Sequence, residues 1–178
     1  LRHTSRSAMG LDFGDIDLDG YDDIIVVDML ARDHGKRMTQ LVRDPLDMQS
    51  QERIDGVPAY NRNTLFFGRP EGSYVEAALM AGVAATDWSW CPIFLDVDLD
   101  GYEDLLVTNG FEFDAMDQDS QDQISGRKLS EQQLKRSRQF YPRWPTRNAA
   151  FRNRRDGTFE PMESWGFNQP GVSYGMAL

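Results

Sequence analysis

Short hydrophobic runs alternate with polar breaks along the whole of this chain, and the breaks are rich in Gly, Asp and Asn. Short runs with β-branched and aromatic side chains, bounded by such residues, are typical of β-strands. The Gly-containing breaks "GRPEG" and "NRRDG" are typical of hairpin turns. The pattern therefore predicts an all-β fold, with strands at residues 8–14, 23–28, 63–68, 73–77, 89–95, 104–109, 148–153 and 158–162.

The predicted strands fall into two groups of four because the sequence repeats. The stretch "GDIDLDGYDDIIVV" from residue 14 returns as "LDVDLDGYEDLLVT" from residue 95, and "RNTLFFGRPEGSYVE" (62–76) returns as "RNAAFRNRRDGTFE" (147–160). The last residues, "SYGMAL" (173–178), resemble "SAMGLDF" (7–13). Repeats of this length, with four antiparallel strands each, are typical of β-propeller blades.

We therefore predict a fragment of a β-propeller that consists of two four-stranded antiparallel blades and the start of a third. The predicted repeats are 1–84, 85–168 and 169–178. Insertions at about 30–60 and about 110–146 separate the second and third strands of the two complete repeats. We expect the remaining blades of a longer parent chain to be partners of this segment.

The two insertions are expected to contain short helices. In the first, Asp44 as N-cap, Pro45 at the first helical position and Gly56 beyond the end predict one helix. In the second, Ser130 and Gln133 form a capping box that predicts another. Such excursions from the strands are where variable binding surfaces tend to lie.

Each repeat carries an acidic loop, D-x-D-x-D-G-x-x-D, before its second predicted strand. A single stretch of this kind is as compatible with a solvated acidic turn as with a site. Carboxylates at positions 1, 3, 5 and 9, a glycine bend at 6 and a carbonyl at 7 can converge on one cation, and such an oxygen cage suits Ca²⁺ better than Mg²⁺. We predict one Ca²⁺ per complete repeat. The predicted ligands are Asp15, Asp17, Asp19, the Tyr21 carbonyl and Asp23 in the first loop, and Asp96, Asp98, Asp100, the Tyr102 carbonyl and Asp104 in the second.

An EF-hand begins with the same spacing, but it needs a Glu at position 12 and flanking helices. Position 12 is Val26 in the first loop and Val107 in the second, and both lie in runs predicted to be strands. The sequence therefore excludes an EF-hand.

The two acidic stretches, followed by "RNTLFFGRPEGSYVEAALMAGV" and "RNAAFRNRRDGTFEPMESWGF", resemble FG-GAP/VCBS-type repeats. These repeats form the blades of calcium-binding β-propellers such as the integrin α-chain head. Within that family, the chain resembles the secreted VCBS-repeat group related to cartilage acidic protein, over nearly its whole length apart from the insertions. The resemblance implies structural Ca²⁺, a location that is extracellular, periplasmic or at the cell surface, and a role in adhesion or ligand binding.

Composition narrows the range of partners. A formal net charge of −10 argues against binding to nucleic acid or to an anionic membrane surface. No apolar run is long enough to span a bilayer. The single cysteine excludes an intrachain disulfide. The protein or glycan ligand that we expect is what the resemblance implies, and the composition is compatible with it.

Catalysis has little support in the sequence. The two histidines, His3 and His34, lie in no nucleophile motif, and no glycine-rich phosphate loop is present. We predict a binding module that is not itself an enzyme. The alternative is part of a secreted propeller enzyme, a polysaccharide- or lipid-acting hydrolase whose catalytic residues lie in the insertions or in missing blades. A purely architectural role is the third possibility.

The tryptophans and the cysteine have structural and functional interpretations. Trp90 aligns with Met9 of the first repeat, which favours a core position over a sugar platform. For Trp88 both interpretations stay open. Trp144, in the second insertion, is the better candidate for an exposed contact. Cys91 aligns with glycines in the other repeats, which favours a small buried residue.

Overall fold

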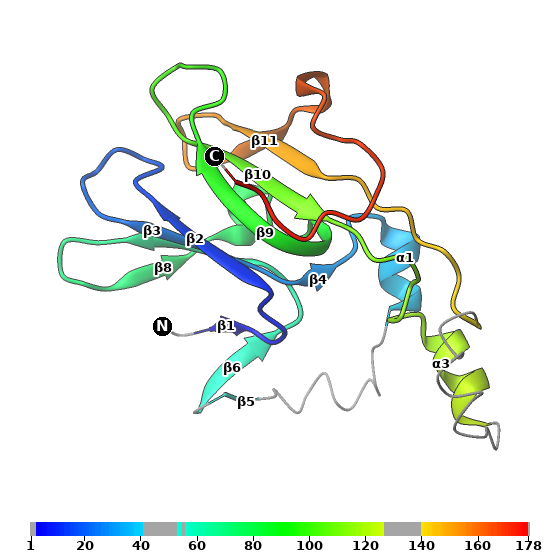
Figure 1. Cartoon of the computed structure of the whole chain (residues 1–178). Coiled ribbons are helices and arrows are strands. Elements are labelled where there is room, and N and C mark those ends of the chain that lie inside the picture. The colour runs from blue at the N-terminus through cyan, green and yellow to red at the C-terminus, as the bar shows by residue number, and fades with distance from the viewer. Residues whose placement is uncertain (1–2, 41–52, 55, 127–139, 178) are drawn as a thin grey trace.

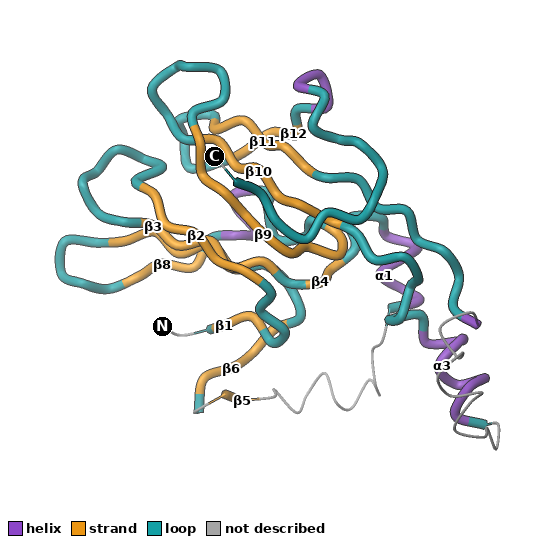
Figure 2. The backbone as a smooth tube through the Cα atoms, viewed as in Figure 1, coloured by secondary structure: helices purple, strands orange, loops and turns teal. Residues whose placement is uncertain are grey.

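The computed structural model describes residues 3–40, 53–54, 56–126 and 140–177 (Figure 1). The described chain is mostly β, as the sequence predicts, and its strands pair mainly in antiparallel sheets. The helices are short connecting elements (Figure 2). Among the described helices, none has the length and apolar character needed to cross a membrane.

The first sheet contains the four strands predicted for the first repeat, each within two residues of the predicted bounds. Its order is β2-β3-β7-β8, and every pair in it is antiparallel. The strands are β2 (Gly10–Gly14), β3 (Asp23–Val27), β7 (Thr64–Gly68) and β8 (Tyr74–Glu76). Sequential strands are therefore neighbours, as in a meander.

The second sheet repeats this arrangement and adds one strand, in the order β12-β11-β10-β9-β4. Its strands are β9 (Asp87–Leu95), β10 (Asp104–Asn109), β11 (Ala149–Asn153), β12 (Phe159–Pro161) and the short β4 (Met29–Leu30). β4 comes from the first repeat and pairs with the start of β9, so a strand of the first repeat forms one edge of the second sheet.

The hydrophobic core lies between the two sheets. Ile25, Val27 and Leu65 from the first sheet share one buried cluster with Phe94 and Leu105 from the second. Strand β2 lies against β9. Gly10 lies in this contact, and a Cβ there would collide with the Trp90 carbonyl oxygen. The absence of a side chain at residue 10 therefore lets the two strands approach closely.

The first insertion contains strand as well as helix. β5 (Arg53–Ile54) and β6 (Val57–Tyr60) form a hairpin, and β6 also pairs in parallel with β1 (Thr4–Ser5). This three-stranded sheet was not expected from the sequence. Its segments are too short for alternation of polar and apolar residues to mark them.

Two helices in the insertions were also not expected. They are α1 (His34–Thr39) and α3 (Gln118–Ser125), and each begins at an aspartate whose side chain accepts a hydrogen bond from the first turn. The helix predicted from Asp44 and the one predicted from Ser130 start at residues outside those the structure describes. Two further short helices are α2 (Ala78–Ala81) and the 3₁₀ turn η2 (Glu163–Trp165).

The aromatic residues divide differently from the expectation. Trp88 is buried, 7% exposed, and stacks on Phe111 with ring centroids 4.6 Å apart. Trp90 is only half-buried, and its indole N–H donates to the Gly110 carbonyl oxygen. Trp144 is half-buried and meets Trp88 edge-on. Cys91 is half-buried, although a buried position was expected.

Candidate metal centres

Both acidic loops connect two antiparallel strands and share one internal hydrogen-bond pattern. The Asp15 carboxylate accepts from the backbone N–H groups of Asp19, at 2.9 Å, and Gly20, at 3.0 Å. The Asp96 carboxylate accepts in the same way from Asp100 and Gly101, both at 2.9 Å. The first carboxylate of each loop thus folds the following residues around itself.

The bend requires left-handed backbone at two positions of each loop. Gly20 and Gly101 have φ of 87° and 90°, which glycine adopts without a steric penalty. Leu18 and Leu99 have φ of 58°, a conformation that costs a non-glycine residue roughly 1–2 kcal/mol. Their side chains are exposed, 53% and 86%. Both leucines therefore carry backbone strain without any compensating burial.

The ninth-position aspartates tie each loop to the third strand of its sheet. Asp23 is fully buried and accepts from the N–H groups of Ile16, at 3.0 Å, and Gly68, at 2.9 Å. Asp104 is also fully buried and accepts from Val97, at 3.0 Å, and Asn153, at 2.9 Å. In both repeats the ninth-position aspartate therefore holds the loop against its sheet through these hydrogen bonds.

Three carboxylates of each loop could hold a metal ion. One oxygen from each member lies within 4.8 Å of the others, and the two groups are Asp15, Asp17 and Asp19, and Asp96, Asp98 and Asp104. Of the predicted ligands, Asp23 and Asp100 lie outside these groups. The N–H groups of Tyr21 and Tyr102 each donate to the fifth-position aspartate at 3.0 Å. Ligation by the tyrosine carbonyls stays a prediction.

The residues present fit a hard divalent cation. The donors are all carboxylate oxygens, which suit Ca²⁺ and Mg²⁺ and not the softer metals. Asp17 Oδ1 is buried and has no hydrogen-bond partner among the described residues. Burial, reinforced by the Asp19 charge, raises the pKa of Asp17. Burial also raises the pKa of Asp23 to about 6, although hydrogen bonds from Gly68 and Ile16 oppose it, and it raises the pKa of Asp104. A cation would relieve this clustered negative charge.

The exclusion of an EF-hand is confirmed. The two loops lie between β2 and β3 and between β9 and β10, with no helix on either side. Val26 lies within β3 and Val107 within β10. Neither offers a side-chain oxygen at position 12.

Arginines from the third-to-fourth-strand hairpins contact both loops, and sequence reasoning missed them. Arg69 lies 3.3 Å from Asp19 and 3.8 Å from Asp17. In the second repeat, Arg152 Nε lies 2.9 Å from Asp98 Oδ2, and Arg155 Nη2 lies 2.7 Å from Asp100 Oδ2. The available signal was the arginine of "GRPEG" and the two of "NRRDG", which stand at corresponding places in the two repeats; it would have indicated Arg69 and Arg155 but not Arg152.

Comparison of the chain with models of protein families, with curated proteins and with solved structures finds no match in any of the three.

Proposed function

We propose that this chain is a calcium-binding segment of a β-propeller that lies outside the cytoplasm and binds a protein or carbohydrate ligand. In this proposal it is related to FG-GAP/VCBS-type repeats, and Ca²⁺ has a structural role. One observation carries the proposal. In both acidic loops, whose corresponding residues are 81 positions apart, the first aspartate accepts the same two backbone hydrogen bonds.

The packing of the two sheets supports a propeller. Leu105 and Phe94 lie on the face of the second sheet that packs on the first. Their counterparts one repeat earlier are Ile24 and Phe13, and Phe13 is 55% exposed on the opposite face of the first sheet. The two sheets therefore pack through opposite faces, an arrangement that we call head to tail. Each sheet has a free face on which a further sheet could pack in the same way. Propeller blades stack in this way.

After the second strand of each sheet, the chain makes a similar contact with the start of the next repeat. Met29 of β4 pairs with Trp88 at the start of the second repeat. One repeat later, a Cβ on Gly110 would meet the backbone of Val172, and the Ser173 N–H donates to the Asn109 carbonyl oxygen at 3.0 Å. The start of the third repeat thus takes up the same position relative to the second sheet.

A calcium ion would supply positive charge at the point where the loop carboxylates crowd together. Aspartates of the two loops arrange this site through their own hydrogen bonds. Asp15 and Asp96 shape the loops through the backbone N–H groups that they accept. Asp23 and Asp104 hold each loop against its sheet. Asp17 has one buried oxygen that accepts no hydrogen bond from the described residues.

Helix α1 of the first insertion and the residues that lead into α3 of the second support a ligand-binding role, because they lie together at the other end of the sheets from the acidic loops (Figure 1). Lys36 of α1 pairs with the fully buried Asp114 at 2.9 Å. Gln40, just after α1, forms a β-bridge with Asp117, the N-cap of α3. Segments that are far apart in the sequence thus make one surface, on which we place the ligand.

Calorimetric titration of the whole chain with CaCl₂ and separately with MgCl₂ tests the proposal. We expect two sites that prefer Ca²⁺, and the loss of one site in Asp17→Asn or Asp98→Asn. Asp22→Asn is the matched control, because Asp22 is exposed, lies in the first loop and is no predicted ligand. A folded chain that binds no Ca²⁺, or binds Mg²⁺ equally well, would contradict the proposal.

A further inference from the structure

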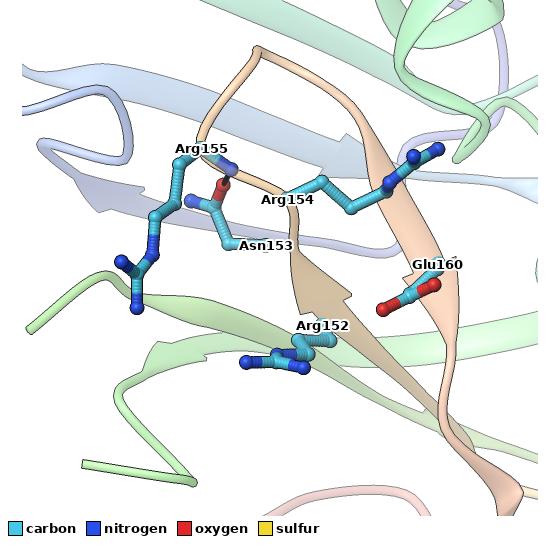
Figure 3. A pocket seen from close by; sticks show the side chains of 5 residues that line it. All are labelled: Arg152, Asn153, Arg154, Arg155 and Glu160. Atoms are coloured by element: carbon cyan, nitrogen blue, oxygen red, sulfur yellow. Dashed lines mark hydrogen bonds between the residues drawn. The ribbon is translucent and has the colours of Figure 1, made fainter. Parts of the chain in front are cut away.

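A hollow of about 220 Å³ lies beside the second acidic loop, on the hairpin of β11 and β12. It is lined by Arg152, Asn153, Arg154, Arg155 and Glu160 (Figure 3). Three of the five lining residues are arginines, in a chain whose net charge is −10. Guanidinium groups offer paired N–H donors that match the oxygens of sulfate, phosphate and carboxylate groups.

Two of these arginines are occupied by the acidic loop. Arg152 donates toward Asp98, and Arg155 donates to Asp100. The hydrogen bond from Arg155 holds the pKa of Asp100 below its ordinary value. The Arg154 guanidinium has no hydrogen-bond or ion-pair partner in the part of the chain that the structure describes. Figure 3 shows it on the other side of the hairpin turn from Arg155.

A cation in the second loop would compete with these arginines. Asp98 belongs to the group of carboxylates that could hold a metal, and its Oδ2 is the atom that Arg152 contacts. A divalent ion there would repel a guanidinium group held against the same carboxylate. Arg152 and Arg155 are 40% and 50% exposed and can swing away without disturbing the core.

We infer that the arginine hollow is a binding site for a sulfate or phosphate group and that a divalent cation in the second loop opens it. The cation takes over the neutralisation of Asp98 and Asp100, and the released guanidinium groups turn to the oxyanion together with Arg154. The inference rests on the proposed function, because it needs a cation at the second loop. The same oxyanion could be free or attached to a sugar.

Glu160 competes with an oxyanion for Arg152. It is the cross-strand partner of Arg152 in the β11–β12 pair, so it offers a released Arg152 an alternative acceptor. We therefore expect Glu160→Gln to strengthen oxyanion binding.

The first repeat differs in sequence at the turn that corresponds to the hollow. Its hairpin turn has Pro70 and Glu71 where the second repeat has Arg155 and Asp156. Within this turn, the Arg69 side chain contacts the first loop. We therefore place the inferred site in the second repeat.

The test is calorimetric titration of the whole chain with a sulfated disaccharide, in saturating CaCl₂ and again in chelator. We expect binding that is about tenfold or more tighter with Ca²⁺, within the usual range of coupling between two sites. Arg154→Gln should abolish it and leave Ca²⁺ binding intact. Arg147→Gln is the control, because Arg147 is an exposed arginine that lies outside both insertions and does not line the hollow.

Parallel titrations with sodium sulfate and with the unsulfated disaccharide identify the source of the affinity. If sodium sulfate binds, the inference is supported and the oxyanion alone accounts for the affinity. If only the sulfated sugar binds, the inference is supported and the sugar also contributes to the affinity. Equal binding of the unsulfated sugar would overturn it. If Ca²⁺ binds at both loops and the sulfated sugar does not bind, this inference fails and the proposed function stands. If Ca²⁺ does not bind, both fail.

Discussion

At the scale of single residues, the two acidic loops differ in their arginine neighbours. Asp19 has one arginine at 3.3 Å, whereas Asp100 has Arg155 at 2.7 Å and Arg152 at 3.6 Å. An arginine that neutralises a carboxylate lowers the electrostatic attraction of the loop for a cation. We therefore expect the second loop to bind Ca²⁺ more weakly than the first.

Replacement of one arginine tests this difference. Arg155→Gln should raise the Ca²⁺ affinity of the second loop by about fivefold or less, as for other exposed ion pairs. The gain should shrink in concentrated salt, because exposed charges are screened. Calorimetric titration at two ionic strengths measures both effects. An affinity that is unchanged at low salt would show that Arg155 does not compete with the ion.

The carboxylates of the site follow from the sequence, but their partners do not. The spacing of Asp15, Asp17 and Asp19 predicts a cluster because the three residues share one tight loop. Arg69 and Arg155 reach the loops from hairpins at least 50 residues away, and no local spacing marks that approach. The framework role of the buried Asp23 likewise depends on Gly68, which belongs to another strand.

At the scale of elements, Asn153 connects the second sheet to the first acidic loop. It is 3% exposed, and its side-chain N–H₂ donates to the Ile16 carbonyl at 2.7 Å and to the Glu103 carbonyl at 3.0 Å. Asn153→Ala should cost about 2 kcal/mol of unfolding free energy, because two buried carbonyls lose their donor. Denaturant unfolding measures this. A loss below about 0.5 kcal/mol, the usual size for a surface change, would show that Asn153 does not hold the sheets together.

An ion pair links the connection between β6 and β7 to the end of β8, and it should give the fold a pH dependence. Arg62 makes two hydrogen bonds to Glu76, at 2.9 and 2.7 Å. Burial acts to raise the pKa of Glu76, but the hydrogen bonds from Arg62 and from the Ala78 N–H outweigh it, so the pKa lies below its ordinary value. The pair therefore stabilises the fold above the pKa of unfolded glutamate. This contribution is lost as the pH falls through the folded pKa.

Glu76→Gln tests that dependence. At neutral pH the variant should lose about 2 kcal/mol of unfolding free energy, because the Arg62 charge stays partly buried without its partner. As the pH falls through the folded pKa of Glu76, the wild type loses the same contribution, and the gap should close. Unfolding by denaturant at neutral pH and at a series of acid pH values measures the gap. A gap of constant size would mean that the charge of Glu76 does not matter.

The strands of the two sheets are predictable apart from the short β4, and the insertion helices are not. Each sheet strand has its own hydrophobic residues between turn-forming residues, and burial in the core selects that pattern. Helices α1 and α3 bury no residue, so no apolar periodicity marks them. Their beginnings at Asp33 and Asp117 could have been identified as N-caps. Aspartate is too common in this chain for that signal to stand out.

At the scale of the whole molecule, Ca²⁺ should act on stability through both loops at once. An ion that binds only the folded state stabilises it by mass action, by about 2.7 kcal/mol per site when free Ca²⁺ is 100-fold above Kd. Thermal unfolding in Ca²⁺ and in chelator should therefore show a large rise in Tm, and a smaller one in Asp17→Asn. If the Tm values are equal in a chain shown to bind Ca²⁺, the ion binds the unfolded state as tightly as the folded state.

The head-to-tail stacking of the sheets gives a matched pair of positions with opposite surroundings. Phe94 is 6% exposed and packs in the core between the sheets, whereas Phe13, at the same register one repeat earlier, is 55% exposed beside Leu11. The backbone environment of the two residues is the same, since each pairs with the second residue of the following strand. The two positions differ in that the first sheet covers Phe94, whereas no described sheet covers Phe13.

Phe94→Ser should therefore cost about 3–5 kcal/mol of unfolding free energy, the usual range for removal of a buried phenylalanine. Phe13→Ser should cost below about 1 kcal/mol and should lower any tendency of the chain to associate, because it removes exposed apolar surface. Denaturant unfolding and sedimentation measure the two effects. In a chain extended by a preceding repeat, a second sheet would cover Phe13, and the cost of Phe13→Ser should rise to that of Phe94→Ser. Equal costs in the present chain would mean that Phe13 is already covered, and the head-to-tail arrangement would then not describe the molecule in solution.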